Sequence, residues 1–186
     1  LAWGGVSSSA WGSWNLDHDI AVTDNSTISA NFMTFTQSGG TAFNVTTGKT
    51  LTISGTLIST TEAASCSCDT NSLKVNSIAG YAGTVLLSGA NTYKGTTTVA
   101  AGTLAVSNAS GLGSTNNGTT VSSGATLDLQ NITVGAETVT LNGGTLATST
   151  GTSSLGGAIA LGANSIVSVA GTQLTLSGVI SGTGLG

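Results

Sequence analysis

Few side chains in this sequence of 186 residues are suited to acid–base chemistry or to metal binding. One cluster of ionisable side chains stands out: Asp17-His18-Asp19, with Asp24 a few residues later. On an extended strand Asp17 and Asp19 would share one face, and their carboxylates would bind Ca²⁺ loosely. No recognisable motif places a nucleophile beside them. We therefore interpret the cluster as a solvated edge strand and predict no metal site.

Glycoside hydrolysis is a second chemistry to consider, because it needs a pair of carboxylates around the scissile bond. Asp128 and Glu137 would approach each other if they lay on neighbouring strands. A polysaccharide lyase would also need basic side chains beside clustered acids. The chain contains no Arg, and its acids are scattered. We predict that both carboxylates lie exposed on the surface and that the chain has no catalytic residues.

The close cysteine pair, Cys66-Ser67-Cys68, is the most distinctive local feature of the sequence. In an extended strand the α-carbons of such a pair lie near the upper end of the range of about 4.4–6.8 Å that a disulfide spans. A turn would relieve this strain. The residues leave three states open: an intrachain bridge in a loop, an interchain bridge, or free thiols. A metal site would need further ligands, and His18 is far away in the sequence.

Composition narrows the class of protein. Charged residues make up 5% of the chain, the net charge is −4, and the only cations are Lys49, Lys74 and Lys94. Without a basic patch we predict no binding of nucleic acid. No apolar run reaches the ~18 residues that a membrane-spanning helix needs, so this segment is not expected to insert into a membrane. A hydrophobic content of 39% and a mean hydropathy of +0.33 argue against disorder.

The same composition predicts an all-β fold. The chain has 33 Thr, 26 Ser and 28 Gly and no Pro, and it is poor in the residues that favour helices. A short phrase recurs, in which Gly is followed by a small polar residue and then by alternating apolar residues. It occurs in Gly48-Lys49-Thr50-Leu51-Thr52-Ile53, Gly102-Thr103-Leu104-Ala105-Val106, Gly124-Ala125-Thr126-Leu127-Asp128-Leu129, Gly144-Thr145-Leu146 and Gly171-Thr172-Gln173-Leu174-Thr175-Leu176. Each occurrence predicts a turn followed by a short strand.

The spacing of these phrases predicts the architecture. Leu104 to Leu127 is 23 residues, Leu127 to Leu146 is 19, and Leu146 to Ile166 is 20. A period near 20 residues with several strands in each period is typical of a solenoid rather than a sandwich. Asn117-Gly118 and Asn142-Gly143 leave a hairpin excursion open. We expect roughly nine coils of roughly 20 residues, stacked ~4.8 Å apart into a rod about 40 Å long.

Residues 87–104 resemble the autotransporter-associated β-strand repeat, whose usual form combines three short stretches. They are Leu87-Ser88-Gly89-Ala90-Asn91-Thr92-Tyr93, then Gly95-Thr96-Thr97, then Gly102-Thr103-Leu104. Ala109-Ser110-Gly111-Leu112-Gly113 continues the pattern, and residues 174–184 resemble the lead into another repeat. The resemblance extends over roughly residues 51–186, with the Cys-containing stretch departing from it.

The resemblance implies a secreted passenger region of a bacterial autotransporter-like adhesin, folded as a right-handed parallel β-helix. It implies an extracellular, cell-surface location, where we expect Cys66 and Cys68 to be oxidised. We divide the chain into Trp-containing coils at 1–50 and β-helix repeats at 51–186, with a Cys-containing loop near 60–73. No cofactor is expected.

We expect a non-enzymatic structural or adhesive rod. The alternatives are a carbohydrate-active β-helix and an inert spacer in a larger surface protein. An uncapped solenoid end exposes strand edges and core residues that recruit other strands. We therefore expect the last coil to be covered by more of the same polypeptide or by a second copy stacked head to tail into a filament. Trp3, Trp11 and Trp14 would cap or dock the other end. Host or surface glycans are further candidate partners.

Overall fold

The structure is a computed structural model that describes residues 6–8, 14–30, 32–35, 39–59 and 71–182. Across these residues every regular element is a β-strand, and none forms a helix. A search of the same residues for a helix that could cross a membrane finds none. The predicted all-β class is therefore confirmed.

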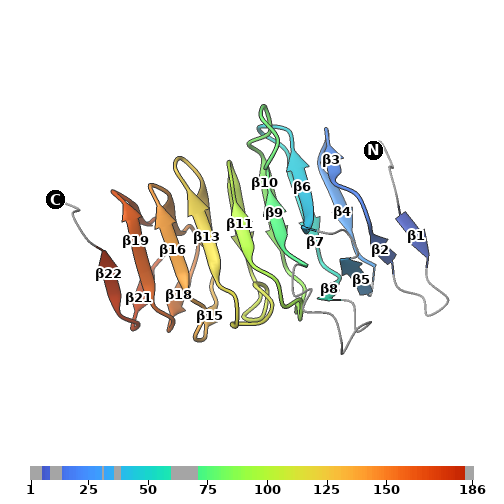
Figure 1. Cartoon of the computed structure of the whole chain (residues 1–186). Coiled ribbons are helices and arrows are strands. Elements are labelled where there is room, and N and C mark those ends of the chain that lie inside the picture. Colours follow the sequence, from blue (N-terminus) through green and yellow to red (C-terminus); the bar gives the residue numbers. More distant parts are fainter. Residues whose placement is uncertain (1–5, 9–13, 31, 36–38, 60–70, 183–186) are drawn as a thin grey trace.

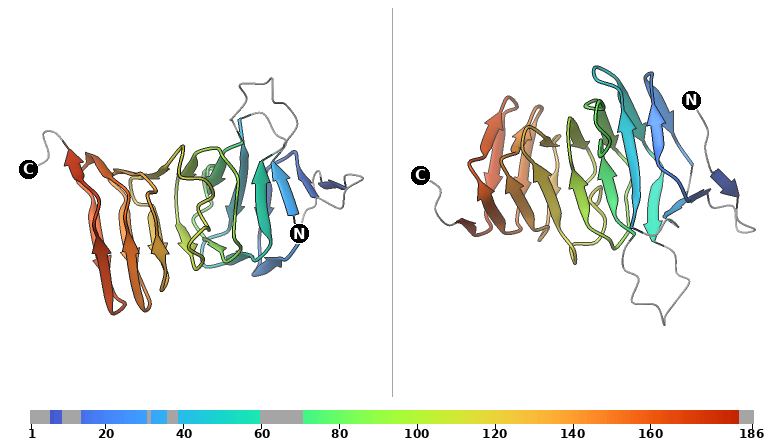
Figure 2. Two further views of the ribbon diagram at one scale, coloured as in Figure 1. Left: turned by 90° about the horizontal axis from the view of Figure 1, so that it is seen from below. Right: turned by 45° about the horizontal axis from the view of Figure 1, so that its top comes forward.

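The strands wind into a parallel β-solenoid of about seven turns with roughly 21 residues per turn. Successive strands belong to successive sides of the coil and pair with strands of the coils before and after (Figure 1). The termini lie at opposite ends of the stack, as Figures 1 and 2 show. The predicted fold is confirmed, but the expectation of nine coils was too high. Leu51 and Val85 are neighbours in register although 34 residues separate them in the sequence, because extra segments lengthen this coil.

Each coil has three sides. The eight-stranded sheet consists of β3 (Ile20–Val22), β6 (Thr41–Val45), β9 (Leu73–Val75), β11 (Thr97–Val99), β13 (Thr119–Ser122), β16 (Val139–Asn142), β19 (Ile159–Ala163) and β22 (Ile180–Gly182). The seven-stranded sheet consists of β4 (Ser26–Ile28), β7 (Thr50–Ile53), β10 (Thr84–Leu87), β12 (Thr103–Val106), β14 (Thr126–Leu129), β17 (Thr145–Thr148) and β20 (Ile166–Val169).

The third side is split in two. Near the N-terminus it holds β1 (Val6–Ser8), β2 (Trp14–Leu16), β5 (Phe32–Phe35) and β8 (Thr56–Ser59). Near the C-terminus it holds β15 (Thr133–Val134), β18 (Thr152–Leu155) and β21 (Gln173–Leu176). Strands pair in parallel throughout, except that β1 pairs with β2 in the antiparallel direction.

The core is a set of apolar columns that run along the stack. In the seven-stranded sheet one column contains Leu51, Val85, Leu104, Leu127 and Leu146, all fully buried. Each such side chain contributes about 1.5–3 kcal/mol by leaving water. The alternating Gly-x-x-Leu-x-Leu phrase produces these columns, because side chains two apart on a strand face the same way.

The next member of this column is Val167, which pairs with Leu146. The expected Leu146-to-Ile166 spacing was therefore wrong by one residue. Ile166 pairs with Thr145 and faces outward, where 61% of it is exposed. A one-residue shift in register moves a side chain to the opposite face of the strand.

Between β8 and β15 the third side is closed by irregular chain at residues 88–96 and 107–118. Tyr93 and Leu112 point inward from these segments and are buried. The Tyr93 ring packs edge-on against Phe35, with centroids 5.6 Å apart and planes at 87°. Large inward side chains thus fill the space that strand residues occupy elsewhere.

Two glycines of these phrases are required by close approach of the backbones. A β-carbon on Gly89 would collide with the carbonyl of Gly55, and one on Gly55 would collide with the carbonyl of Ala30. Gly102 has a φ of +64° and packs against Gly83, so it meets both requirements for glycine. The recurring Gly therefore marks the corners at which successive coils pack most closely.

Neither Asn-Gly pair forms a hairpin. Asn142 ends β16, and the chain passes through Gly143 into β17, which belongs to a different sheet. Asn117-Gly118 leads directly into β13, which pairs in parallel with β11 and β16. The open alternative of a hairpin excursion at these positions was wrong. Both pairs lie at corners between sides.

Candidate functional site

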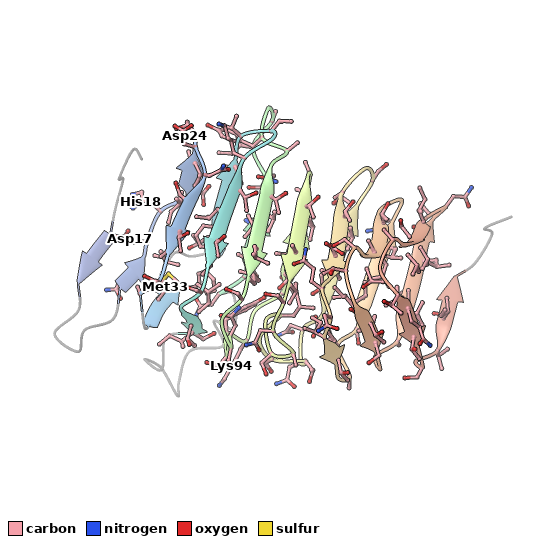
Figure 3. All side chains as sticks on the ribbon, turned by 180° about the vertical axis from the view of Figure 1, so that it is seen from behind. Asp17, His18, Asp24, Met33 and Lys94 are labelled. Atoms are coloured by element: carbon pink, nitrogen blue, oxygen red, sulfur yellow. The ribbon has the colours of Figure 1, made fainter. Side chains whose placement is uncertain are left out.

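The ionisable residues near the N-terminus do not converge on one site. Asp17, His18 and Asp19 lie in the corner between β2 and β3, not on the predicted strand. Asp19 accepts a hydrogen bond of 2.8 Å from the backbone N–H of Ala42 in the next coil. Figure 3 shows Asp17, His18 and Asp24 spread along the N-terminal end of the stack.

The remaining contacts of this cluster are local ion pairs. His18 Nδ1 lies 3.0 Å from Asp17 Oδ1, and Asp24 Oδ1 lies 3.4 Å from Lys49 Nζ. The described residues contain no group of three or more acidic, His or Cys side chains that would hold a metal ion.

Asp128 connects two coils. It lies on the outward face of β14, and only 6% of it is exposed. Oδ1 accepts a hydrogen bond of 2.8 Å from the Ser149 backbone N–H, and Oδ2 accepts hydrogen bonds from Ser149 Oγ at 2.6 Å and Gln130 Nε2 at 2.8 Å. Because Ser149 belongs to the following coil, the carboxylate fastens the two coils together.

Glu137 lies inside the solenoid wall. It occupies the corner between β15 and β16, and 2% of it is exposed. Oε1 accepts a hydrogen bond of 2.8 Å from Thr119 Oγ1, and Oε2 is buried without a hydrogen-bond partner. Burial raises the pKa of Glu137 above its ordinary value, and the hydrogen bond from Thr119 partly opposes this rise.

The two carboxylates do not form the pair that glycoside hydrolysis requires. Asp128 faces outward from the seven-stranded sheet, whereas Glu137 points inward at the corner before the eight-stranded sheet. Their hydrogen-bond partners are different residues. The prediction that both are exposed surface acids was also wrong, because neighbouring side chains and the wall bury them.

Tyr93 forms a second buried polar contact close to Glu137. Its hydroxyl lies 2.6 Å from Thr97 Oγ1, and Thr97 is the register neighbour of Thr119. Burial raises the pKa of the phenol far above its usual range, the hydrogen bond with Thr97 opposes this rise, and the charge of Glu137 adds to it. Tyr93, Thr97, Thr119 and Glu137 form what we call the buried polar cluster.

Two buried asparagines, which sequence reasoning did not single out, also join coils. Asn76 Oδ1 accepts the Val45 N–H at 2.7 Å, while Nδ2 donates to the carbonyls of Gly83 and Ala101. Asn91 Oδ1 accepts the Leu57 N–H at 2.9 Å, and Nδ2 donates to the Gly111 carbonyl at 2.6 Å. An Asn in a Gly-rich, Thr-rich corner was the available signal, but it also fits an exposed turn.

A shallow polar groove of about 300 Å³ lies on the outside of the eight-stranded sheet. It is lined by Asn116, Asn117, Gly118, Thr119, Thr120, Thr138 and Thr140. Asn117 Nδ2 is engaged with the Lys94 carbonyl at 2.6 Å. The lining has amide and hydroxyl groups but no charged or aromatic side chain, so the groove lacks the groups that would fix a specific ligand.

Several predicted positions lie outside the described residues. They include Cys66, Cys68, Trp3 and Trp11. Trp14 is the first residue of β2, and its backbone pairs with Ser8 of β1. The disulfide and the aromatic docking surface therefore stay predictions.

The C-terminal end of the stack exposes its apolar core. Val167, Val169 and Ile180 continue inward columns but are 54%, 50% and 53% exposed. The strands that carry the end, β20, β21 and β22, are each at the edge of a sheet. At the opposite end the corresponding core is covered, because Leu16 and Val22 are 2% and 1% exposed.

Comparison with known proteins adds a family for part of the chain. Residues 81–106 match the passenger-associated-transport-repeat. No curated protein and no solved structure matches the chain significantly. The matched segment contains β10, β11, β12 and the irregular chain that carries Tyr93. The repeat and the β-solenoid fit an autotransporter passenger repeat protein, which confirms the resemblance found for residues 87–104. This family implies a secreted or surface-exposed protein and suggests a structural role.

Proposed function

We propose that this chain is a non-enzymatic structural segment of a passenger region on the bacterial cell surface, where it acts as a rod of stacked coils. The observation that carries this proposal is the use of the candidate acids. Asp19 bonds to Ala42 and Asp128 to Ser149, each in the next coil, and Glu137 bonds to Thr119 inside the wall. Side chains spent on holding coils together are not available to bind a substrate.

A glycan screen tests the non-enzymatic role. The purified chain should release no products from a panel of polyuronates and neutral polysaccharides, because no pair of carboxylates faces a cleft in the described residues. Asp128→Asn and Glu137→Gln provide the controls, since they keep the shape of each side chain. An activity that disappears in either variant would overturn the structural role.

The exposed C-terminal end supports a partner for this rod. We expect it to receive a further β-coil whose inward side chains extend the columns of Val167, Val169 and Ile180. Apolar patches and unpaired strand edges are the usual marks of such an interface. The N-terminal end of a second copy fits this face less well, because β1 already occupies the outer edge of β2 on the third side. A further coil of the polypeptide is thus the favoured occupant.

A further inference from the structure

The buried polar cluster leaves one ionisable group without compensation. Glu137 Oε1 has its hydrogen bond from Thr119, but Oε2 is buried and has no partner. The ion pairs in the described part of the chain are Asp17 with His18 and Asp24 with Lys49, so no cation is paired with Glu137. An ionised carboxylate with one unpartnered buried oxygen is costly, whereas a protonated one carries no charge.

The elements packed around Glu137 bring no cation that would change this conclusion. On the preceding side, Thr119 of β13 faces it, with Thr97 of β11 and the Tyr93 phenol beyond. Tyr93 is the one titratable group found to interact with Glu137, and it would add negative charge only at very high pH. On the following side, Gly157 packs against the Glu137 backbone and has no side chain. The next inward residue along the chain is Val139, which is fully buried.

We infer that Glu137 is a pH-sensitive latch in the solenoid wall: the neutral carboxylic acid holds the coil between β13 and β16 closed, and loss of its proton loosens that coil. This inference is independent of the structural role proposed above. It assigns a regulatory property to a group that neither glycan chemistry nor the apolar columns account for.

The sign of the pH dependence follows from burial. The folded chain holds the Glu137 proton more tightly than the unfolded chain, because the pKa is raised in the fold. Below the ordinary carboxyl pKa of about 4.3 both states are protonated, and the stability is fully present. As the pH rises from there to the raised pKa, the unfolded chain loses the proton first and stability falls. One such group changes the unfolding equilibrium by at most about tenfold per pH unit.

Hydrogen exchange between pH 5 and pH 8 tests the latch. After correction for the intrinsic pH dependence of exchange, the amides of β13 and β16 should lose protection in the wild type as the pH rises. Glu137→Gln should keep them protected and flatten the response, because its side chain cannot ionise. Asp24→Asn removes an exposed acid at the other end of the stack and should retain the wild-type response. Equal pH dependence in the wild type and Glu137→Gln would overturn the inference.

Infrared spectroscopy of the wild-type chain gives a second reading that does not depend on how the variant folds. A buried protonated carboxyl should give a carboxylic-acid carbonyl band that disappears on titration to alkaline pH. Its disappearance should accompany the loss of amide protection in β13 and β16. A carboxylate that is already ionised at pH 5, with those amides still protected, would contradict the latch.

Discussion

Replacing Tyr93 with Ala should lower the free energy of unfolding by about 3–5 kcal/mol, as expected when a large buried ring is removed and a cavity remains. Tyr93 is fully buried, packs edge-on against Phe35 and bonds to Thr97. It also lies in irregular chain, where no strand of the third side can close over the space. Denaturant unfolding followed by far-UV circular dichroism measures the change.

Tyr93→Phe is the matched control. It keeps the ring against Phe35 and removes the hydroxyl, which leaves the buried Thr97 hydroxyl without this partner. The expected loss is about 1–2 kcal/mol. If Tyr93→Ala cost no more than Tyr93→Phe, the ring would not be filling the third side of the coil.

The second large effect is expected at Asp128. Asp128→Ala should lower the free energy of unfolding by about 2–3 kcal/mol, because it removes the acceptor of three hydrogen bonds and leaves the Ser149 N–H unpartnered. The loss concerns the junction between two coils, so amide protection should fall in β14 and β17 before it falls elsewhere.

Asp24→Ala is the control for this prediction. The Asp24 side chain is 80% exposed and forms a surface ion pair with Lys49. Such a pair contributes about 0–1 kcal/mol, so the variant should remain close to the wild type. Equal effects of the two substitutions would mean that Asp128 is an ordinary surface acid, as its sequence context first indicated.

The repeating phrases predicted the fold because they encode both the turn and the inward face of the strand that follows. Leu51, Leu104, Leu127 and Leu146 took the expected inward positions. Ile166 did not, because that coil has one more residue than a constant period allows, and Val167 takes the inward position. Alternation within a strand is a local property, whereas register depends on the length of each corner.

The candidate site was harder to predict because corners do not follow strand alternation. Glu137 precedes β16 and turns inward, and Tyr93 does the same from chain that is not a strand. Asp128 does alternate outward as a strand residue should, yet Ser149 and Gln130 cover it. The sequence identified these as noteworthy acids, but their partners come from coils about 20 residues away.

The most direct test of the rod with an open C-terminal end is sedimentation velocity over a range of concentrations. The wild-type chain should associate as the concentration rises, because β20, β21 and β22 present unpaired edges around an exposed apolar core. A variant carrying Val167→Glu and Ile180→Glu should stay monomeric with an unchanged far-UV spectrum. Association lost in this variant is the result that we predict. A wild-type chain that remains strictly monomeric and soluble, with the amides of its last coil protected, would contradict the account.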